Sequence, residues 1–371
     1  MHLRLTATFL RGKSVPMRYT ILVINPGSTS TKFGVFEGAV QLFADSVAHS
    51  SEEIARFPTI ASQYEFRDQH IRGSLAKRGF DLKRVSAVIG RGGLLRPIPG
   101  GIYRVTEGLK KDLASATYGE HASNLGGLIA ASLASQVGVP AFIADPVVVD
   151  ELSDLARVSG NKLFKRKSIF HALNQKAVAR RWCAAHNARY EDVSLIVAHM
   201  GGGVSIGLHE KGKVVDVNNA LNGEGPFSPE RSGTLPTLDL VKLCFSGTLK
   251  EQEICKLIAG KGGFVSFLGS NDMQMVEKRC HDGDPEATLY YKAFIYQTGK
   301  AIGALAAAAK GKVNGILLTG GIAYNAEIIE GIREMCGFIA PVTAYPGEGE
   351  LEALAEAGVR ALTNPAEILT Y

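Results

Sequence analysis

The chain contains two copies of a short pattern whose residue types suit phosphate binding. In each copy an apolar run leads to a polar residue and a turn of small residues, and a second apolar run follows; the copies span 21–36 and 195–208. Strand, tight turn and strand is the simplest interpretation. Backbone N–H groups in such turns can approach phosphate oxygens closely, because no large side chain intervenes. Either copy alone could be an ordinary Gly-rich hairpin, but the repetition favours two sites for the two ends of a polyphosphate.

Two better-known phosphate-binding motifs do not fit the sequence. A P-loop requires G-x-x-x-x-G-K-[ST] followed by a helix, whereas Lys32 leads into the strand pattern 33–36. The chain also has no G-x-G-x-x-G between a predicted strand and a predicted helix, which disfavours a Rossmann dinucleotide site.

Charged side chains at predicted strand ends could supply the rest of a phosphoryl-transfer site. Such chemistry needs a carboxylate-held Mg²⁺ and positive charge around the transferring group. Asp145 follows the predicted strand 141–144 and precedes Pro146, so it is the best metal candidate, although an Asp here could also cap the following turn. Arg91 stands among glycines after the predicted strand 85–89, where a guanidinium could clamp a carboxylate or phosphate.

Three further side chains are candidates for the same site. Arg231 lies in the long polar loop 222–236, where a local salt bridge with Glu230 is the alternative interpretation. His171 opens a predicted helix, and His199 ends a predicted strand. A lone His in either place more often makes a structural hydrogen bond, and we keep that interpretation for His199. His171 is the better candidate for stabilising charge.

Composition limits the classes of function. With 371 residues, 46% of them hydrophobic, the chain can form two domains with sizeable cores. The net charge is +5, but residues 1–18 contain four basic and no acidic residues, so the remainder carries about +1 and nucleic acid is an unexpected partner. The five cysteines show no C-x-x-C spacing, which argues against a disulfide framework or a zinc site and favours a reducing cytoplasm.

No segment of the sequence is expected to cross a membrane. The longest apolar region, 128–149, is interrupted by polar residues and a proline. Residues 1–18 are basic, but their apolar run is too short for a secretory signal, so we expect a disordered extension there.

The order of predicted elements indicates the fold. A meander of three strands followed by alternating helices and strands occurs twice, which is the pattern of the ribonuclease-H-like domain shared by the actin, Hsp70 and sugar-kinase group. We therefore expect an α/β fold of two such domains with a cleft between them. The N-terminal domain would comprise 19–148 plus 352–371, and the nucleotide-binding C-terminal domain would comprise 149–351. Within the latter we expect a helix over 150–158 and a strand over 338–342.

From residue 19 to its end, the chain resembles the family of acetate and butyrate kinases. The resemblance rests on several motifs in the right order: 25–32, Arg91-Gly92-Gly93, 144–151, 169–174, 198–206, 229–233, 318–323 and 345–348. A set of motifs in sequence is far more specific than any one of them.

The resemblance implies a role for each matching residue, with ATP and Mg²⁺ as ligands. Phosphates and metal would be faced by Asn25, Ser28, Ser30 and Lys32, and Asp145 would act near Mg²⁺. His171 and Arg231 would stabilise the transferring phosphoryl group. His199 and Gly201, Gly202 and Gly203 would form the second phosphate loop, and the adenosine site would be lined by Gly320, Gly321 and Ile322.

Two positions depart from the family's pattern. The C-terminal catalytic glutamate of the family, on the metal side, could be either Glu348 or Glu350. Acetate kinases carry a His in place of Arg91 and an Arg three residues earlier, where this chain has Val88, so the role of Arg91 can differ.

The implied reaction is reversible, direct in-line transfer of the γ-phosphoryl group of ATP to a short-chain carboxylate, giving an acyl phosphate. The carboxylate is already ionised, so the site needs positive charge rather than a general base. Butyrate is the expected acceptor, with isobutyrate, propionate and acetate as alternatives, and the family implies a homodimer or a larger assembly. The alternatives are a sugar kinase of the same fold, with Asp145 as base, and a non-enzymatic nucleotide switch.

Overall fold

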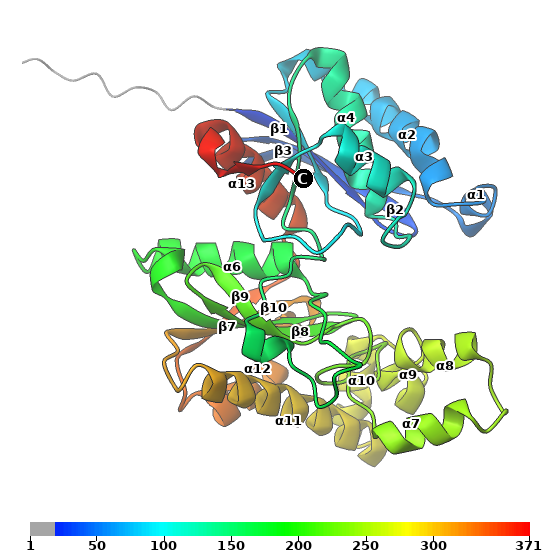
Figure 1. Ribbon diagram of the computed structural model, residues 1–371, viewed down its shortest axis with the longest axis vertical. Helices are drawn as coiled ribbons and strands as arrows, with labels where there is room; N and C mark the ends of the chain where they lie inside the picture. Colours follow the sequence, from blue (N-terminus) through cyan, green and yellow to red (C-terminus); the bar gives the residue numbers. More distant parts are fainter. Residues whose placement is uncertain (1–18) are drawn as a thin grey trace, which may run out of the picture.

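The computed structural model describes residues 19–371 and contains two β-sheets, each with helices packed against it (Figure 1). The extension predicted for residues 1–18 lies outside the described residues. Among the described helices, none is both long enough and apolar enough to span a membrane.

The first sheet begins with an antiparallel meander and continues with parallel strands. Its order is β12-β5-β6-β4-β1-β2-β3; β4 and β6 run parallel to β1, and β5 is antiparallel to β6. The strands are β1 (Thr20–Pro26), β2 (Ser30–Glu37), β3 (Val40–Ala48), β4 (Ala87–Arg91), β5 (Ile102–Arg104), β6 (Ala141–Ala144) and β12 (Ile368–Leu369). The C-terminal strand β12 therefore completes the sheet that the N-terminal strands begin.

The second sheet repeats the same arrangement with five strands in the order β11-β10-β7-β8-β9. β7, β8 and β9 form the meander, and β10 and β11 add parallel strands. The strands are β7 (Ser194–Met200), β8 (Val204–Glu210), β9 (Lys213–Val217), β10 (Gly315–Gly320) and β11 (Val342–Pro346). The predicted α/β fold, with a repeated meander in two mixed sheets, is confirmed.

The central strands are buried on both faces because helices cover both, whereas the edge strand β3 is largely exposed. In β1, Leu22 and Ile24 pack against α2 and α4, whereas Ile21 and Val23 pack against α13. This alternation follows from the two-residue period of a strand. The helices are α1 (Ser51–Ile54), α2 (Tyr64–Lys77), α3 (Glu107–Ala114), α4 (Asn124–Val137), α5 (Asp154–Arg157), α6 (Ala172–Ala185), α7 (Thr237–Cys244), α8 (Glu251–Ile258), α9 (Gly263–Leu268), α10 (Met273–His281), α11 (Pro285–Ala308), α12 (Ala326–Cys336) and α13 (Glu350–Thr363).

Helix α6 connects the two halves of the structure. It packs against β7 and β10 through a core that includes Val178 and Trp182, while Leu173 and Ala177 join the core beneath α13 and the first sheet. Figure 1 shows α6 on the side of the second sheet that is turned toward the first. The position of α6 therefore depends on both sheets at once.

Two predicted elements differ from the structure. The strand expected over 338–342 begins only at Val342, because the register with β10 pairs Ile316 with Val342, and Phe338 is exposed in the preceding turn. The helix expected over 150–158 is reduced to α5, Asp154–Arg157.

The segment before α5 is extended because its polar groups bond elsewhere. The backbone N–H of Asp150 donates to the carbonyl oxygen of Ile98 at 2.9 Å. The buried carboxylate of Glu151 accepts from the backbone N–H of Gly100 at 2.9 Å and from that of Val214 at 2.7 Å, and it pairs with Lys176 of α6. Glu151 thus links the loop before β5, the edge strand β9 and α6.

Candidate active site

The first phosphate-type turn, between β1 and β2, is held from behind by a buried arginine. All four carbonyl oxygens of 27–30 accept hydrogen bonds within the protein. Arg67 of α2, only 1% exposed, donates to three of them at 2.7–3.1 Å, and the backbone N–H of His49 donates to the fourth at 2.8 Å. Carbonyl oxygens would repel a phosphate. Because all four accept hydrogen bonds from the protein, the turn is suited to binding an anion.

Arg67 was missed by the sequence analysis, because an arginine in a largely polar helix carries no local sign of burial. The predicted residues of this turn have more open positions. Ser28 and Lys32 are exposed and Ser30 is half-buried, so their side chains are accessible to a ligand.

Three of the predicted residues meet at the end of β1. The amide Nδ2 of Asn25 donates to Glu350 Oε2 at 2.6 Å. Arg91, at the end of β4, pairs with the Glu350 carboxylate at 3.1 Å, and its Nη1 lies 3.4 Å from Asn25 Oδ1. Register places these groups together, since Ile24 of β1 lies beside Gly90 of β4 and Glu350 begins α13 on the same sheet.

The two candidate glutamates lie close enough to affect each other. Burial and the charge of Glu350 raise the pKa of Glu348, and Lys32 and Arg91 oppose that effect. The loop that carries Glu348 is anchored by Asn174 of α6, whose Nδ2 donates to the Glu348 carbonyl oxygen at 2.5 Å. The two mutually repelling carboxylates and the Asn25 amide could supply oxygen ligands to a divalent cation, but in this arrangement Glu350 is engaged by Arg91 and by the amide nitrogen of Asn25.

Asp145 lies at the end of β6, as predicted, but its carboxylate is already engaged. Oδ1 accepts from the backbone N–H of Gly101 at 2.7 Å, and Oδ2 pairs with Arg180 of α6 at 3.3 Å. The residue is 2% exposed and has a φ of +37°, an unfavourable conformation for a side chain other than Gly. The structure therefore does not join Asp145 to the Asn25, Arg91 and Glu350 cluster, and its predicted role stays a prediction.

The second phosphate-type turn, Gly201–Gly203, packs against Arg231. A Cβ added to Gly203 would lie 1.9 Å from Arg231 Nη1, so only a glycine leaves room for the guanidinium. Ser228 Oγ donates to the Gly202 carbonyl oxygen at 2.7 Å, and Nη1 of Arg231 donates to the Ala220 carbonyl oxygen at 2.6 Å. The turn and the arginine are thus fixed to each other.

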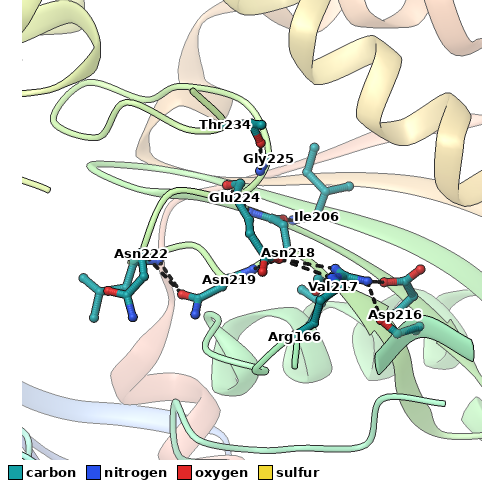
Figure 2. Close-up of polar contacts among 12 residues, drawn as sticks. Arg166, Ile206, Asp216, Val217, Asn218, Asn219, Asn222, Glu224, Gly225 and Thr234 are labelled. Atoms are coloured by element: carbon teal, nitrogen blue, oxygen red, sulfur yellow. Dashed lines mark hydrogen bonds and ion pairs between the residues drawn. The ribbon is translucent and has the colours of Figure 1, made fainter. Parts of the chain in front are cut away.

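Polar contacts hold the long loop that carries Arg231 (Figure 2). Arg166 donates to Asp216 at 2.9 Å and to the carbonyl oxygen of Val217 at 2.8 Å, and it pairs with Glu224. The Glu224 carboxylate also accepts from the backbone N–H of Asn219 at 3.0 Å. Ala220 is the next residue after Asn219, and its carbonyl oxygen accepts the hydrogen bond from Arg231. The contacts of Arg166 and Glu224 therefore help to set the position of the Arg231 guanidinium.

His171 and His199 are stacked, with ring centroids 3.8 Å apart and planes at 12°. Burial, with the nearby charges of Arg91 and Arg231, lowers the pKa of His199 to about 3 and holds the pKa of His171 well below its ordinary value. Both imidazoles are therefore neutral near neutral pH, and the two nearby arginines favour that neutral form. Because Arg91 belongs to the first sheet and Arg231 to the loop that follows β9 of the second sheet, the histidines mark the region where the two groups of site residues meet.

His121 is a further site residue that the sequence analysis missed. Its side chain is exposed, its Nδ1 lies 2.8 Å from Ser123 Oγ, and partial desolvation together with the charges of Arg91 and Arg231 lowers its pKa. It stands in the turn before α4, and the polar sequence of that turn was the one available signal.

A cavity of about 730 Å³ brings the second turn and the end of β10 together. The predicted residues among those lining it are Gly201, Gly202, Gly321, Ile322 and Glu348. Gly320 is buried and is not among the lining residues, and its backbone exchanges hydrogen bonds with that of Gly347 at 3.0 and 3.1 Å. A cavity of this size, next to the second turn, could hold a nucleoside.

Comparisons with known proteins identify the family of the chain. The model of the acetokinase family matches residues 152–338. A probable butyrate kinase of Clostridium botulinum (strain Alaska E43 / Type E3) is 52% identical over 355 residues, which are 96% of this chain and 100% of the relative. Butyrate kinase 2 of Clostridium acetobutylicum is 53% identical with the same coverage. The chain belongs to the acetokinase family.

The acetokinase fold is also recognisable among solved structures. A crystal structure of acetate kinase from Porphyromonas gingivalis matches with a TM-score of 0.74 at 19% identity, covering 92% of this chain and 99% of the other. The resemblance predicted from the sequence motifs is therefore confirmed at the level of family and fold, while the roles of single residues stay predictions.

The contact between Gly203 and Arg231 leads to a first prediction. In this acetokinase, Gly203→Ala should displace the guanidinium and lower the kcat/KM of phosphoryl transfer by about 100-fold, the cost of a misplacement near 1 Å. The matched control is Gly303→Ala in α11, where an added Cβ meets nothing within 4 Å. A Gly203→Ala enzyme with wild-type kcat/KM and unchanged melting temperature would contradict the assignment of Arg231 to the site.

The buried histidines lead to a second prediction. His49 is 4% exposed with a pKa of about 4, His199 has a pKa of about 3, and the pKa of fully buried His209 is also well below its ordinary value. Below about pH 6.5 the unfolded chain therefore binds protons that the folded chain does not, and stability falls as pH falls, by up to about 1.4 kcal/mol per pH unit for each histidine. Urea unfolding at about pH 7.5 and 5.5 should show a lower midpoint at the acidic pH. An equal or higher midpoint there would contradict the neutral assignment.

Proposed function

We propose that this acetokinase transfers the γ-phosphoryl group of ATP to a short-chain carboxylate, with butyrate as the preferred acceptor, and forms an acyl phosphate and ADP. The observation that carries the proposal is 52–53% identity to proteins named butyrate kinases over their whole length. Isobutyrate, propionate and acetate are the alternative acceptors, because one methylene in an apolar pocket is worth only about 1–3 kcal/mol.

The charges of the site suit a reaction in which two anions must meet. A carboxylate oxygen of the acceptor attacks the γ-phosphorus, the bond from this phosphorus to the β–γ bridging oxygen breaks, and the electron pair leaves with ADP. No proton has to be removed, because the acceptor is already ionised. Arg91 offers fixed positive charge from the first sheet and Arg231 from the loop after β9, and the same charges help to keep His171 and His199 neutral.

Each part of the site has a proposed role in this reaction. Arg91 would hold the acceptor carboxylate, exchanging its contact with Glu350 for the substrate. Arg231 and His171 would contact the transferring phosphoryl group, as the sequence motifs imply. The remaining phosphates would lie on the turns at 27–30 and 201–203, with His199 beside the second, and the adenosine would lie against Gly320, Gly321 and Ile322.

Asn25, Glu348 and Glu350 would hold Mg²⁺. Their oxygens would fit such an ion once Glu350 leaves Arg91 and the Asn25 amide turns its oxygen toward the carboxylates, and the repulsion between Glu348 and Glu350 favours a cation between them. Bound with ATP, Mg²⁺ would neutralise charge on the phosphates. For Asp145 to act near the metal, its carboxylate would have to exchange its contacts with Gly101 and Arg180.

We propose that 19–148 with 352–371 and 149–351 behave as two domains that close over the ligands, which would limit hydrolysis of ATP by water. Packing of α13 and β12 with the first sheet supports this division. By family resemblance we propose a homodimer or a larger homo-oligomer. The five cysteines are free thiols, which supports a reducing, cytoplasmic location.

A hydroxyl kinase is less well supported. Such an enzyme needs a carboxylate base beside the hydroxyl group, and both oxygens of the candidate, Asp145, are engaged by Gly101 and Arg180.

Acyl-phosphate trapping with hydroxylamine tests the proposal. With ATP and Mg²⁺, butyrate or isobutyrate should give more hydroxamate than acetate, and ADP release should match it. An Arg231→Gln variant purified in parallel should form no hydroxamate. A contaminating kinase would be present in both preparations, so this loss would show that the activity belongs to this chain. ADP release with a sugar but no hydroxamate would move the assignment to a hydroxyl kinase, and no product with any acceptor would favour a nucleotide switch.

A further inference from the structure

A row of buried polar side chains leads from the edge of the second sheet to His171. In β8, Ser205 and His209 lie on the face turned toward α6, as the two-residue period of a strand requires, with Gly207 between them. The Gln175 carboxamide of α6 fills the space over Gly207, where an added Cβ would lie 2.5 Å from its Oε1. We call Tyr190, His209, Gln175 and Ser205 the polar row; none of the four is more than 6% exposed.

The direction of the hydrogen bonds in the polar row is fixed at Gln175. Its Nε2 lies 3.0 Å from the backbone carbonyl oxygen of Ser205, which can only accept. The amide group must therefore be oriented with Nε2 toward Ser205 and Oε1 toward His209. The second hydrogen of Nε2 is donated to Ser205 Oγ at 2.8 Å.

The directions of the hydrogen bonds among Gln175, His209 and Tyr190 follow from this orientation. His209 Nε2 lies 3.0 Å from Gln175 Oε1, an acceptor, so this nitrogen carries a hydrogen. Burial keeps His209 neutral by lowering its pKa, so Nδ1 is unprotonated and accepts from the Tyr190 hydroxyl at 2.7 Å. Burial also raises the pKa of Tyr190, which keeps that hydroxyl protonated.

The direction of the hydrogen bond between Ser205 and His171 follows from the fact that the Ser205 hydroxyl has a single hydrogen to donate. Its oxygen receives the Gln175 amide hydrogen and faces the backbone N–H of His171 at 3.5 Å, and both of these groups can only donate. The remaining contact of Oγ is His171 Nδ1 at 2.8 Å. If Nδ1 also donated, the fully buried hydroxyl hydrogen would have no acceptor, which is costly. The hydroxyl therefore donates to Nδ1.

We propose that the polar row fixes His171 as the tautomer protonated on Nε2, so that a neutral histidine presents a hydrogen-bond donor to the transferring phosphoryl group. The tautomer follows from the contacts alone, whereas the role toward the phosphoryl group rests on the proposed function. Among the described residues, none makes a hydrogen bond with His171 Nε2, and the half-buried ring leaves that edge available to a ligand. Tyr190, His209, Gln175 and Ser205 are positioning residues in this account.

The neighbouring histidine has the opposite tautomer. Asn174 Nδ2 donates to the Glu348 carbonyl oxygen, which orients the amide and leaves Oδ1 to accept from His199 Nδ1 at 2.8 Å. Neutral His199 is therefore protonated on Nδ1 and has a lone pair on Nε2. Of the two stacked rings, only His171 can donate from Nε2, which gives a physical reason to assign the phosphoryl contact to it.

The tautomers can be read directly in solution. Long-range ¹H–¹⁵N correlation spectra of the full chain, labelled with ¹⁵N-histidine and recorded without ligands at neutral pH, distinguish the two neutral forms. His171→Gln and His199→Gln assign the two signals. We expect Nε2–H for His171 and Nδ1–H for His199. A protonated His171, or one with Nδ1–H, would overturn the inference regardless of whether the enzyme acts on butyrate.

Variants of Ser205 test the consequence for catalysis. Ser205→Ala removes the donor to Nδ1 and should lower kcat by about 10–100-fold with little change in KM, because the lost interaction is made in the transition state. Ser205→Thr keeps the hydroxyl and should restore both kcat and the His171 signal, while Ser135→Ala, on the exposed face of α4, controls for loss of a hydroxyl elsewhere. A folded Ser205→Ala enzyme with wild-type kcat would overturn the role of the row. If the variant does not fold, the spectrum of the wild-type protein still decides the tautomer.

Discussion

Helix α6 is packed against both sheets, and the polar residues at its beginning contact the polar row, His199 and the loop of Glu348. His171 reaches the polar row, Asn174 joins His199 to the loop of Glu348, and Lys176 forms the buried pair with Glu151. Because the helix is buried on several sides, none of these side chains can move without disturbing a core. The burial of α6 thus positions groups from both sheets relative to one another.

The electrostatic arrangement follows from this packing. Arg91 approaches from the first sheet and Arg231 from the loop after β9, and both lie near imidazoles that burial keeps neutral. Positive charge at the site is therefore permanent and does not depend on histidine protonation. Glu348 and Glu350 add negative charge beside Asn25, and Glu350 pairs directly with Arg91. Phosphates carried with a divalent cation would match these adjoining positive and negative groups.

Much of the fold could be predicted because its signals are local. The two meanders follow from apolar periodicity and Gly-rich turns, and the clustering of Asn25 with Arg91 follows from adjacent parallel strands. The strand β11 was misplaced because its position depends on register with β10, which local hydrophobicity does not encode. Arg67 and Gln175 were missed for a similar reason: their partners are distant in sequence, and only the packed structure shows that they are buried.

The central claim is that Arg91, at the end of β4, and Arg231, in the loop after β9, act on one pair of reacting anions. A double-mutant cycle with Arg91→Gln and Arg231→Gln, read as kcat/KM for acyl phosphate formation, tests it most directly. If both arginines serve one transition state, the two losses should be non-additive by at least about 0.5 kcal/mol. Effects that add within about 0.3 kcal/mol would mean that the two residues act independently, and would contradict the account.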